Sequence, residues 1–221
     1  DWRPDINKIE SLVSGFPDMA FDLAVALPCV TTLIDPSGDL FQECLKAAKI
    51  VGRDFPHLRT VDPNASSDPW ESEDDIPEEA FGLVDLTREA ASEGVVLSME
   101  NSGQSIHSMQ ILVDAIRSRL PSEEATYIGL CPDPTNQLRR LPDSDPLLEL
   151  DALPLDMIKI VHFKQARRGK AYHSVDTGDL DCKKMLTILE EKGYSGAAIM
   201  EIPSHENVFD NLEHSFEFLQ S

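Results

Sequence analysis

Short apolar runs alternate along this chain with longer segments of helical period, and this alternation restricts the fold more than any other feature. The short runs are rich in Val, Ile and Leu, as buried strands of parallel sheets are. The longer segments place apolar residues three and four positions apart, the spacing of amphipathic helices. We therefore expect an α/β fold of repeated βα units around a parallel sheet. The expected strands are Asp22–Leu27, Arg59–Asp62, Val95–Glu100, Tyr127–Cys131, Ile158–Phe163 and Ala197–Ile202.

Five segments are expected to form helices, and glycines mark three of their ends. Gly52, Gly94 and Gly193 each follow a helical pattern, where the chain often needs a positive φ to leave the helix. Two stretches rich in proline and acidic residues, Pro63–Pro77 and Leu141–Pro154, are expected to be surface loops. The expected helices are Asp39–Val51, Glu78–Glu93, Ser105–Leu120, Cys182–Lys192 and Asn207–Leu219.

Composition excludes several classes of protein. With 40 acidic and 19 basic side chains, the net charge of −21 repels a phosphate backbone, so nucleic acid is not an expected partner. The longest nearly apolar stretch, Leu23–Ile34, is too short and too interrupted to cross a membrane. The four cysteines show no C-x-x-C spacing, which favours buried thiols in a reducing compartment such as the cytoplasm. A length of 221 residues favours a single domain.

Four of the expected strands lead to a side chain that can bind a metal ion. Because strand residues alternate between faces, Ser98 lies on the same strand face as Glu100, and Cys131 lies on the same face as Asp133. Each gap between them matches one strand plus one helix, so successive parallel strands would deliver them to the same rim. The residues are Glu100, Asp133, His162 and Glu201, with gaps of 33, 29 and 39 positions.

These residue types define the kind of metal. Three carboxylates and one imidazole form a set dominated by oxygen, which favours Mn²⁺ or Mg²⁺ and also accommodates Co²⁺ or Zn²⁺. Each residue alone has an ordinary explanation. A strand-end acid such as Glu100 or Glu201 is usually solvated, and a histidine such as His162 is often a hydrogen-bonded residue of the interior. Their shared phase and spacing favour a metal site over these explanations.

Four segments carry the predicted ligands and also carry a family likeness. In their order and spacing they resemble the xylose-isomerase-like superfamily of sugar isomerases and epimerases. The resemblance covers residues 22–220 and implies a TIM barrel whose fifth to eighth strands end in the four metal ligands. The segments are Val96-Leu97-Ser98-Met99-Glu100-Asn101, Cys131-Pro132-Asp133-Pro134-Thr135-Asn136, Val161-His162-Phe163-Lys164-Gln165, and Gly178-Asp179-Leu180-Asp181 leading through Gly193-Tyr194-Ser195-Gly196 to Glu201.

The chain departs from the family pattern at some positions. The family often has Asp after the lysine that follows the metal histidine, whereas Gln165 stands here, so no role of that acid carries over. Ketose 3-epimerase-like members place a second histidine where this chain has Asn136, which we expect to contact substrate. Their substrate-contacting arginine corresponds to Arg168. The alternative for Arg168 is a solvated basic run, Arg167-Arg168-Gly169-Lys170.

The sequence shows fewer strands than the resemblance implies. Only Asp22–Leu27 and Arg59–Asp62 precede the strand that ends in Glu100, although that strand would be the fifth. An eight-stranded barrel of this type usually needs about 250 residues. We therefore predict a TIM barrel that lacks its first two βα units.

The resemblance implies proton-transfer chemistry on a ketose-like hydroxy-ketone. Glu201 and Glu100 would act as base and acid around an enediolate, and Lys164 would stabilise the developing oxyanion unless it is a solvated rim lysine. A dehydratase of a cyclic keto-polyol or keto acid would use the same enolate, and a non-catalytic sugar-binding module is a further alternative. The superfamily's apurinic endonuclease branch is disfavoured by the charge and by the placement of the other histidines. The expected partner is a small sugar or keto-polyol, and a homo-oligomer is left open.

Overall fold

The computed structural model describes residues 2–66 and 68–221 and divides them into two compact units. The single-domain organisation expected from chain length stays a prediction. The units interleave along the sequence, so that α4 (Ile106–Arg117) and β4 (Ile128–Cys131) each begin in one unit and end in the other. The first unit contains the chain up to Ala65, Trp70–Glu100 and Ile111–Gly129; the second contains Ser66–Pro69, Asn101–Gln110 and Leu130–Ser221.

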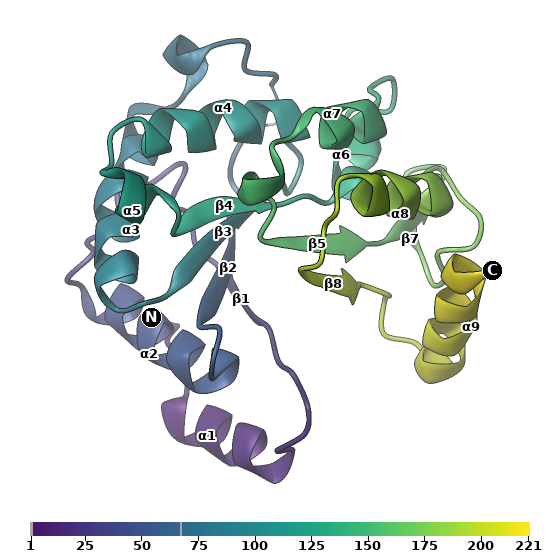
Figure 1. Ribbon diagram of the computed structural model, residues 1–221, viewed down its shortest axis with the longest axis horizontal. Helices are drawn as coiled ribbons and strands as arrows, with labels where there is room; N and C mark the ends of the chain where they lie inside the picture. Colours follow the sequence, from purple (N-terminus) through teal and green to yellow (C-terminus); the bar gives the residue numbers. More distant parts are fainter. Residues whose placement is uncertain (1, 67) are drawn as a thin grey trace. The chain divides into compact units, whose positions relative to one another are not determined.

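The first unit is built on three parallel strands (Figure 1). The register places Ala24 opposite Arg59, and Arg59 opposite Ser98, so these three side chains share one face of the sheet. The start of β4 joins the far edge, where the Leu97 backbone N–H donates to the Tyr127 carbonyl oxygen at 2.7 Å. The strands, in spatial order, are β1 (Leu23–Ala26), β2 (His57–Val61) and β3 (Val96–Glu100).

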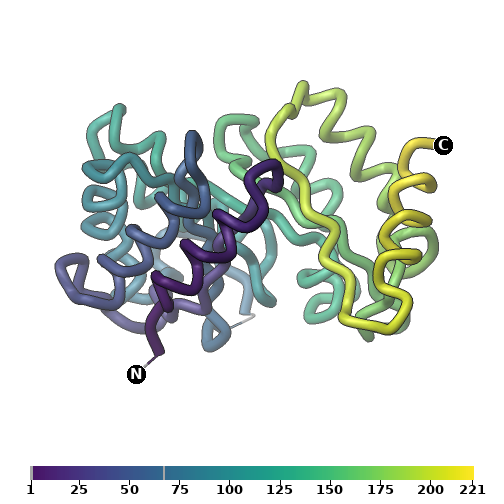
Figure 2. The backbone as a smooth tube through the Cα atoms, turned by 90° about the horizontal axis from the view of Figure 1, so that it is seen from below, coloured from purple at the N-terminus to yellow at the C-terminus, as the bar shows by residue number. Residues whose placement is uncertain are grey.

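Helices cover the other face of this sheet. α2 turns an apolar stripe that includes the fully buried Phe41, Leu45 and Ala48 toward β1 and β2, as its sequence period predicts. α1 lies along α2, as Figure 2 shows. The helices of this unit are α1 (Ile6–Gly15), α2 (Asp39–Gly52), α3 (Leu83–Ser92) and α5 (Ser122–Ala125), with short 3-10 helices η1 (Glu73–Asp75) and η2 (Glu78–Gly82).

The second unit continues the βα order. The Lys159 backbone N–H donates to the Leu130 carbonyl oxygen at 2.9 Å, which joins the end of β4 to the segment before β5. β5 and β8 then pair in parallel, with His162 opposite Ile199. The strands are β5 (Ile160–Phe163), β8 (Ala197–Met200) and the antiparallel hairpin of β6 (Gln165–Arg167) and β7 (Lys170–Tyr172). The helices are α6 (Pro134–Arg140), α7 (Pro146–Ala152), η3 (Leu155–Met157), α8 (Cys182–Glu191) and α9 (Val208–Gln220).

All six predicted strands and all five predicted helices are present, with shifted ends, but one loop prediction was wrong. Leu141–Pro154 contains α7, because Asp145 caps it by accepting from the Leu148 N–H and Pro146 occupies the first turn. The loop predicted at Pro63–Pro77 contains η1, and its residue 67 lies outside the described part of the chain.

Helix ends follow the glycine prediction at two of three places. Gly94 and Gly193 have φ of 71° and 72°, in the left-handed region. Gly52 is instead the last residue of α2, and the positive φ of 50° falls on Arg53.

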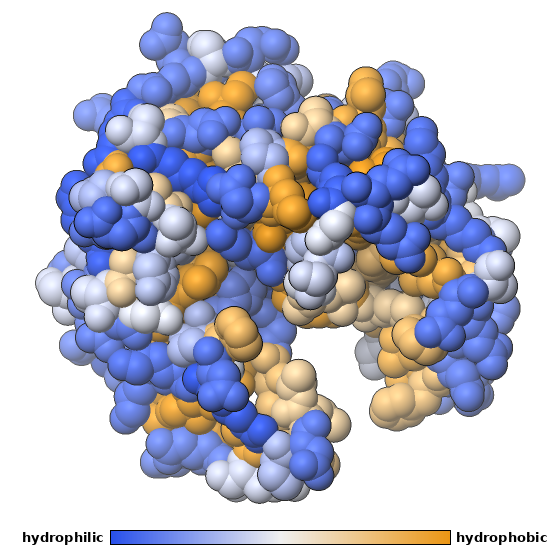
Figure 3. Space-filling view, in the orientation of Figure 1, coloured by the Kyte–Doolittle hydropathy of each residue, from blue (hydrophilic) through white to orange (hydrophobic). Residues whose placement is uncertain are grey.

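The surface carries some exposed apolar residues, and the interior holds the cysteines. Figure 3 shows hydrophobic surface over α9, where Phe209 is 80% exposed. All four cysteines are buried free thiols, as predicted. Within the described residues, no helix combines the length and apolar character needed to cross a membrane.

Candidate metal centre

Asp133 is fixed at the junction between β4 and α6. It is the N-cap of α6, and its Oδ1 accepts from the Asn136 backbone N–H at 2.8 Å. Pro134 begins the helix without a backbone N–H, in a position where none is needed. The Asp133 side chain is fully buried. Because the cap uses Oδ1, the second oxygen, Oδ2, faces the neighbouring polar side chains.

His162, in β5, and Glu201, directly after β8, reach the same place. Backbone hydrogen bonds fix the position of both residues. The His162 N–H donates to the Pro132 carbonyl at 3.1 Å, and the Glu201 N–H donates to the Phe163 carbonyl at 3.0 Å. His162 Nδ1 lies 3.1 Å from Glu201 Oε2 and 3.6 Å from Asp133 Oδ2. Asp133, His162 and Glu201 each offer a ligand atom, and these atoms lie within 4.8 Å of one another. The structure thus brings together three of the four predicted ligands within the second unit.

Lys164 supplies the positive charge of this cluster. Its Nζ lies 3.0 Å from Asp133 Oδ2 and 2.9 Å from Glu201 Oε2, and it donates to Asn136 Oδ1 at 3.2 Å. Burial acts to lower the pKa of Lys164, but the charges of Asp133 and Glu201 outweigh it and the pKa is raised. The lysine is therefore an ammonium at neutral pH. With only 9% of its side chain exposed, it is not a solvated rim residue.

Glu201 differs from its two partners in being accessible. Its side chain is 47% exposed, whereas those of Asp133 and His162 are fully buried. The hydrogen bond from His162, together with Lys164, outweighs burial and lowers the pKa of Glu201 to about 2. It is an ionised carboxylate at neutral pH, and it is the member of the cluster that a molecule arriving from solvent can reach.

Two asparagines brace the aspartate. Asn101 Nδ2 donates to the Asp133 carbonyl at 2.9 Å, and Asn101 Oδ1 accepts from the Asp133 N–H at 2.8 Å. Asn136, predicted as a substrate contact, is buried; its Nδ2 donates to the Asn101 carbonyl at 3.1 Å. The sequence alone predicts no role for Asn101. The only available signal was its position directly after a predicted ligand.

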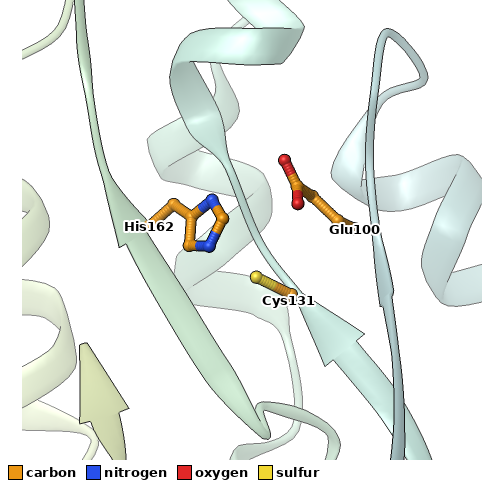
Figure 4. Close-up of side chains that lie close together, drawn as sticks. All are labelled: Glu100, Cys131 and His162. Atoms are coloured by element: carbon orange, nitrogen blue, oxygen red, sulfur yellow. The ribbon is translucent and has the colours of Figure 1, made fainter. Parts of the chain in front are cut away.

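A cysteine adds a possible soft ligand. Cys131, in β4, is fully buried, and its sulfur lies within 4.8 Å of a ligand nitrogen of His162, in β5. Figure 4 shows both side chains. The predicted set contained no thiol, although Cys131 shares its strand face with Asp133. Its presence widens the range of metals that this part of the chain could accept to those that favour sulfur.

Glu100, the remaining predicted ligand, belongs to the first unit and ends β3 (Figure 4). Its side chain is 7% exposed, and Oε2 accepts a hydrogen bond from Arg59 Nη1. Arg59 also pairs with Asp22, 2.8 Å from Nη2 to Oδ2. This network was not predicted, although Arg59 has the inward phase on its strand.

Arg168 and Gln165, two positions singled out by the family resemblance, both make hydrogen bonds to the loop before α8. Arg168 is exposed at the tip of the β6–β7 hairpin with φ of 53°, and its backbone N–H donates to Asp179 Oδ1 at 3.0 Å. Its contact with substrate stays a prediction. Gln165 is buried and makes two hydrogen bonds with the backbone of Leu180. Its Nε2 donates to the Leu180 carbonyl oxygen at 2.8 Å, and its Oε1 accepts from the Leu180 N–H at 3.0 Å. The amide that replaces the family's acid thus anchors the loop before α8.

Comparison with known proteins identifies the family. Residues 35–221 match the family described as "Xylose isomerase-like TIM barrel". The chain belongs to this family, and the predicted α/β TIM-barrel fold class is confirmed. The predicted lack of two βα units stays a prediction. No curated protein matches the chain.

Solved structures share the fold at low sequence identity. One is the IOLI protein with a bound zinc atom, 16% identical, with a TM-score of 0.66 over 96% of this chain and 78% of that one. Another is a xylose isomerase-like TIM barrel protein from Mycobacterium smegmatis in complex with magnesium, 15% identical, with a TM-score of 0.67 over 98% and 78%. A third is an L-ribulose 3-epimerase, 16% identical, with a TM-score of 0.64 over 97% and 72%.

Proposed function

We propose that the protein is a divalent-metal-dependent sugar isomerase or epimerase that acts on a ketose-like hydroxy-ketone. The observation that carries the proposal is the convergence of Asp133, His162 and Glu201 around the ammonium of Lys164. Membership of the family supports the fold around this site, and the names of similar structures, several of them sugar 3-epimerases, support the substrate class.

The residues present fit a divalent cation. Two carboxylate oxygens and an imidazole nitrogen, all within 4.8 Å of one another, are suitable first-row and alkaline-earth ligands. We propose Glu100 as the fourth ligand: the family motif assigns it this role, and its chain neighbour Asn101 is bonded to the backbone of Asp133. Mn²⁺ or Mg²⁺ is the proposed ion, with Co²⁺ or Zn²⁺ as alternatives. Similar structures are described with zinc and with magnesium.

The proton transfer is assigned to the accessible glutamate. A divalent cation at this site would polarise the substrate carbonyl and acidify the adjacent C–H. Glu201 is ionised and about half exposed, so it can receive that proton and give an enediolate. Delivery of a proton to the opposite face, which we propose Glu100 makes after it takes up a proton from solvent, inverts the carbon, and Glu201 then releases the abstracted proton to solvent. Return of the proton to the neighbouring carbon interconverts ketose and aldose.

Lys164 and Asn136 complete the proposed reaction site. The Lys164 ammonium donates to Asn136 Oδ1 and can also donate to the oxygen on which negative charge develops. Since its pKa is raised, Lys164 holds its proton and acts as a hydrogen-bond donor rather than as a base. Arg168 is proposed to contact the distal part of the substrate. Buried free cysteines support a reducing, cytoplasmic setting for this chemistry.

Solvent-deuterium incorporation tests the proposal directly. The Mn²⁺-loaded protein is incubated in D₂O with a panel of ketoses and keto acids, and exchange is followed by proton NMR. We expect exchange at a carbon next to the carbonyl, and we expect Glu201→Gln to abolish it. Exposed Glu206 provides the matched control, because Glu206→Gln should leave exchange unchanged. Loss of a β-hydroxyl would indicate the dehydratase instead, and absence of exchange on every substrate would favour a sugar-binding module.

A further inference from the structure

The inner face of the first unit's sheet holds a group of charged side chains. Asp22 precedes β1, His57 and Arg59 stand on β2, and Glu100 ends β3. Strand alternation and the register of the three strands put all of them on one face. Their side chains are only 16%, 18%, 13% and 7% exposed, in the order named.

Arg59 is the centre of this group. Its Nε donates to Asp22 Oδ2 at 2.9 Å, its Nη2 lies 2.8 Å from the same oxygen, and its Nη1 donates to Glu100 Oε2. Asp22 is held in turn by His57, whose Nδ1 lies 3.2 Å from Oδ1. His57 Nε2 lies 2.8 Å from Ser98 Oγ. The guanidinium is therefore oriented from one side by Asp22 and presents its other side to Glu100.

A buried group of charges is an unfavourable way to stabilise a fold. Withdrawing charges from water carries a penalty of several kcal/mol per ion, and well-packed apolar residues often serve as well or better. Small neighbours make the arrangement possible: Arg59 is paired in register with Ala24 on one side and Ser98 on the other. A buried arginine between two carboxylates calls for a reason beyond packing.

We propose that Arg59 is a positioning residue for Glu100 and thereby for the metal. By engaging Oε2, the guanidinium would restrict rotation of the Glu100 carboxylate and so hold it in one orientation for a bound cation. Partners that orient metal ligands in this way typically account for ten- to hundred-fold of metal affinity. The inference rests on the proposed function, since it assumes that Glu100 is a ligand.

The positive charge of Arg59 would itself affect metal affinity, apart from any orienting role. A guanidinium near a cation site repels the cation, so loss of Arg59 by itself could raise affinity. Asp22 neutralises Arg59, however, and the pair contributes little net charge. Replacing both residues removes the orientation while keeping the net charge of the first unit unchanged.

The test compares Mn²⁺ binding by the charge-neutral double variant Arg59→Met/Asp22→Asn with that of the wild type. Isothermal titration calorimetry gives the affinity, Mn²⁺ electron paramagnetic resonance reports the symmetry of the ligand set, and circular dichroism reports folding. The matched control, Arg119→Met/Glu73→Gln, removes an exposed ion pair of the same unit, with side chains 38% and 49% exposed.

We expect the double variant to bind Mn²⁺ roughly ten- to hundred-fold more weakly with a changed resonance spectrum, and the control to bind like the wild type. A folded double variant with unchanged affinity and spectrum would overturn the role of Arg59 while leaving the proposed function intact. A wild type that binds no Mn²⁺ would overturn the proposed function and this inference with it. If the double variant does not fold, Arg59→Lys decides: it keeps the charge but cannot bridge both carboxylates, so weaker binding supports positioning and wild-type binding refutes it.

Discussion

Replacing Lys164 with methionine should destabilise the metal-free protein, because it removes the ammonium that lies 3.0 Å from Asp133 Oδ2 and 2.9 Å from Glu201 Oε2. Methionine has a similar length and no charge, so the variant separates charge from volume. The contact to Asp133 is buried on both sides, with side chains 9% and 0% exposed. Breaking a buried pair of this kind costs about 3–5 kcal/mol, since it leaves an uncompensated charge.

The size of the effect follows from the exposure of the two carboxylates. Glu201 is 47% exposed, so its contact with Lys164 adds at most about 1 kcal/mol. Asp133 has its α6 cap as partial compensation, which places the total near the lower end, at about 3 kcal/mol. For a chain of this length, about 2–4 °C of melting temperature corresponds to each kcal/mol, so we expect a drop of roughly 6–12 °C.

The assay is thermal unfolding followed by circular dichroism in EDTA. Lys49→Met is the control, because Lys49 pairs with Glu93 in an exposed bridge, with side chains 47% and 41% exposed, and should change stability by less than about 1 kcal/mol. Mn²⁺ should then stabilise Lys164→Met at least as much as the wild type, about 2.7 kcal/mol at a hundred times the dissociation constant. A metal-free Lys164→Met protein that melts with the wild type would refute the reasoning.

Three further predictions concern stability. In the metal-free protein the pKa of Glu201 is about 2 in the folded state and 4.5 in the unfolded state, so its contribution to the free energy of unfolding is present above pH 4.5 and is lost as the pH falls toward 2. Urea unfolding should therefore show that acid lowers the free energy of unfolding less in Glu201→Gln than in the wild type. An equal decrease in the two proteins would count against the lowered pKa. Leu58→Ala, at a fully buried position, should cost about 2–5 kcal/mol by urea unfolding, against less than about 0.5 for Leu148→Ala, 66% exposed; similar costs would argue against the packing described. Asn101→Ala removes the side chain that pairs with the Asp133 backbone N–H and carbonyl, and it should cost about 1–3 kcal/mol by urea unfolding; unchanged stability would argue against the brace.

Much of the fold, and the convergence of three of the proposed ligands, could be predicted because they depend on local periodicity. Hydrophobic runs identify strands, and alternation identifies which side chain a strand turns inward, so Asp133, His162 and Glu201 could be brought to one rim by counting. α7 was missed because Pro146 and its acidic neighbours suggest a loop, although Asp followed by Pro is also a regular helix start.

The partners of the ligands could not be predicted in the same way. That Arg59 meets Asp22 and Glu100 depends on the register between three strands, which one sequence does not specify. That Lys164 lies between two carboxylates depends on the packing of side chains at the ends of β5 and β8. Periodicity assigns a face to a residue, whereas tertiary structure assigns its neighbours.

Calorimetric titration of the metal-free protein with Mn²⁺ tests the central claim most directly. Asp133→Asn keeps the α6 cap, because asparagine is also a good N-cap, and removes only the charge of the fully buried carboxylate. We predict one Mn²⁺ per wild-type chain and an affinity at least about a hundred-fold weaker in Asp133→Asn, at the upper end of what even an indirect partner contributes. Absence of binding to the wild type, or equal binding by the two proteins, would contradict the metal centre proposed for this chain.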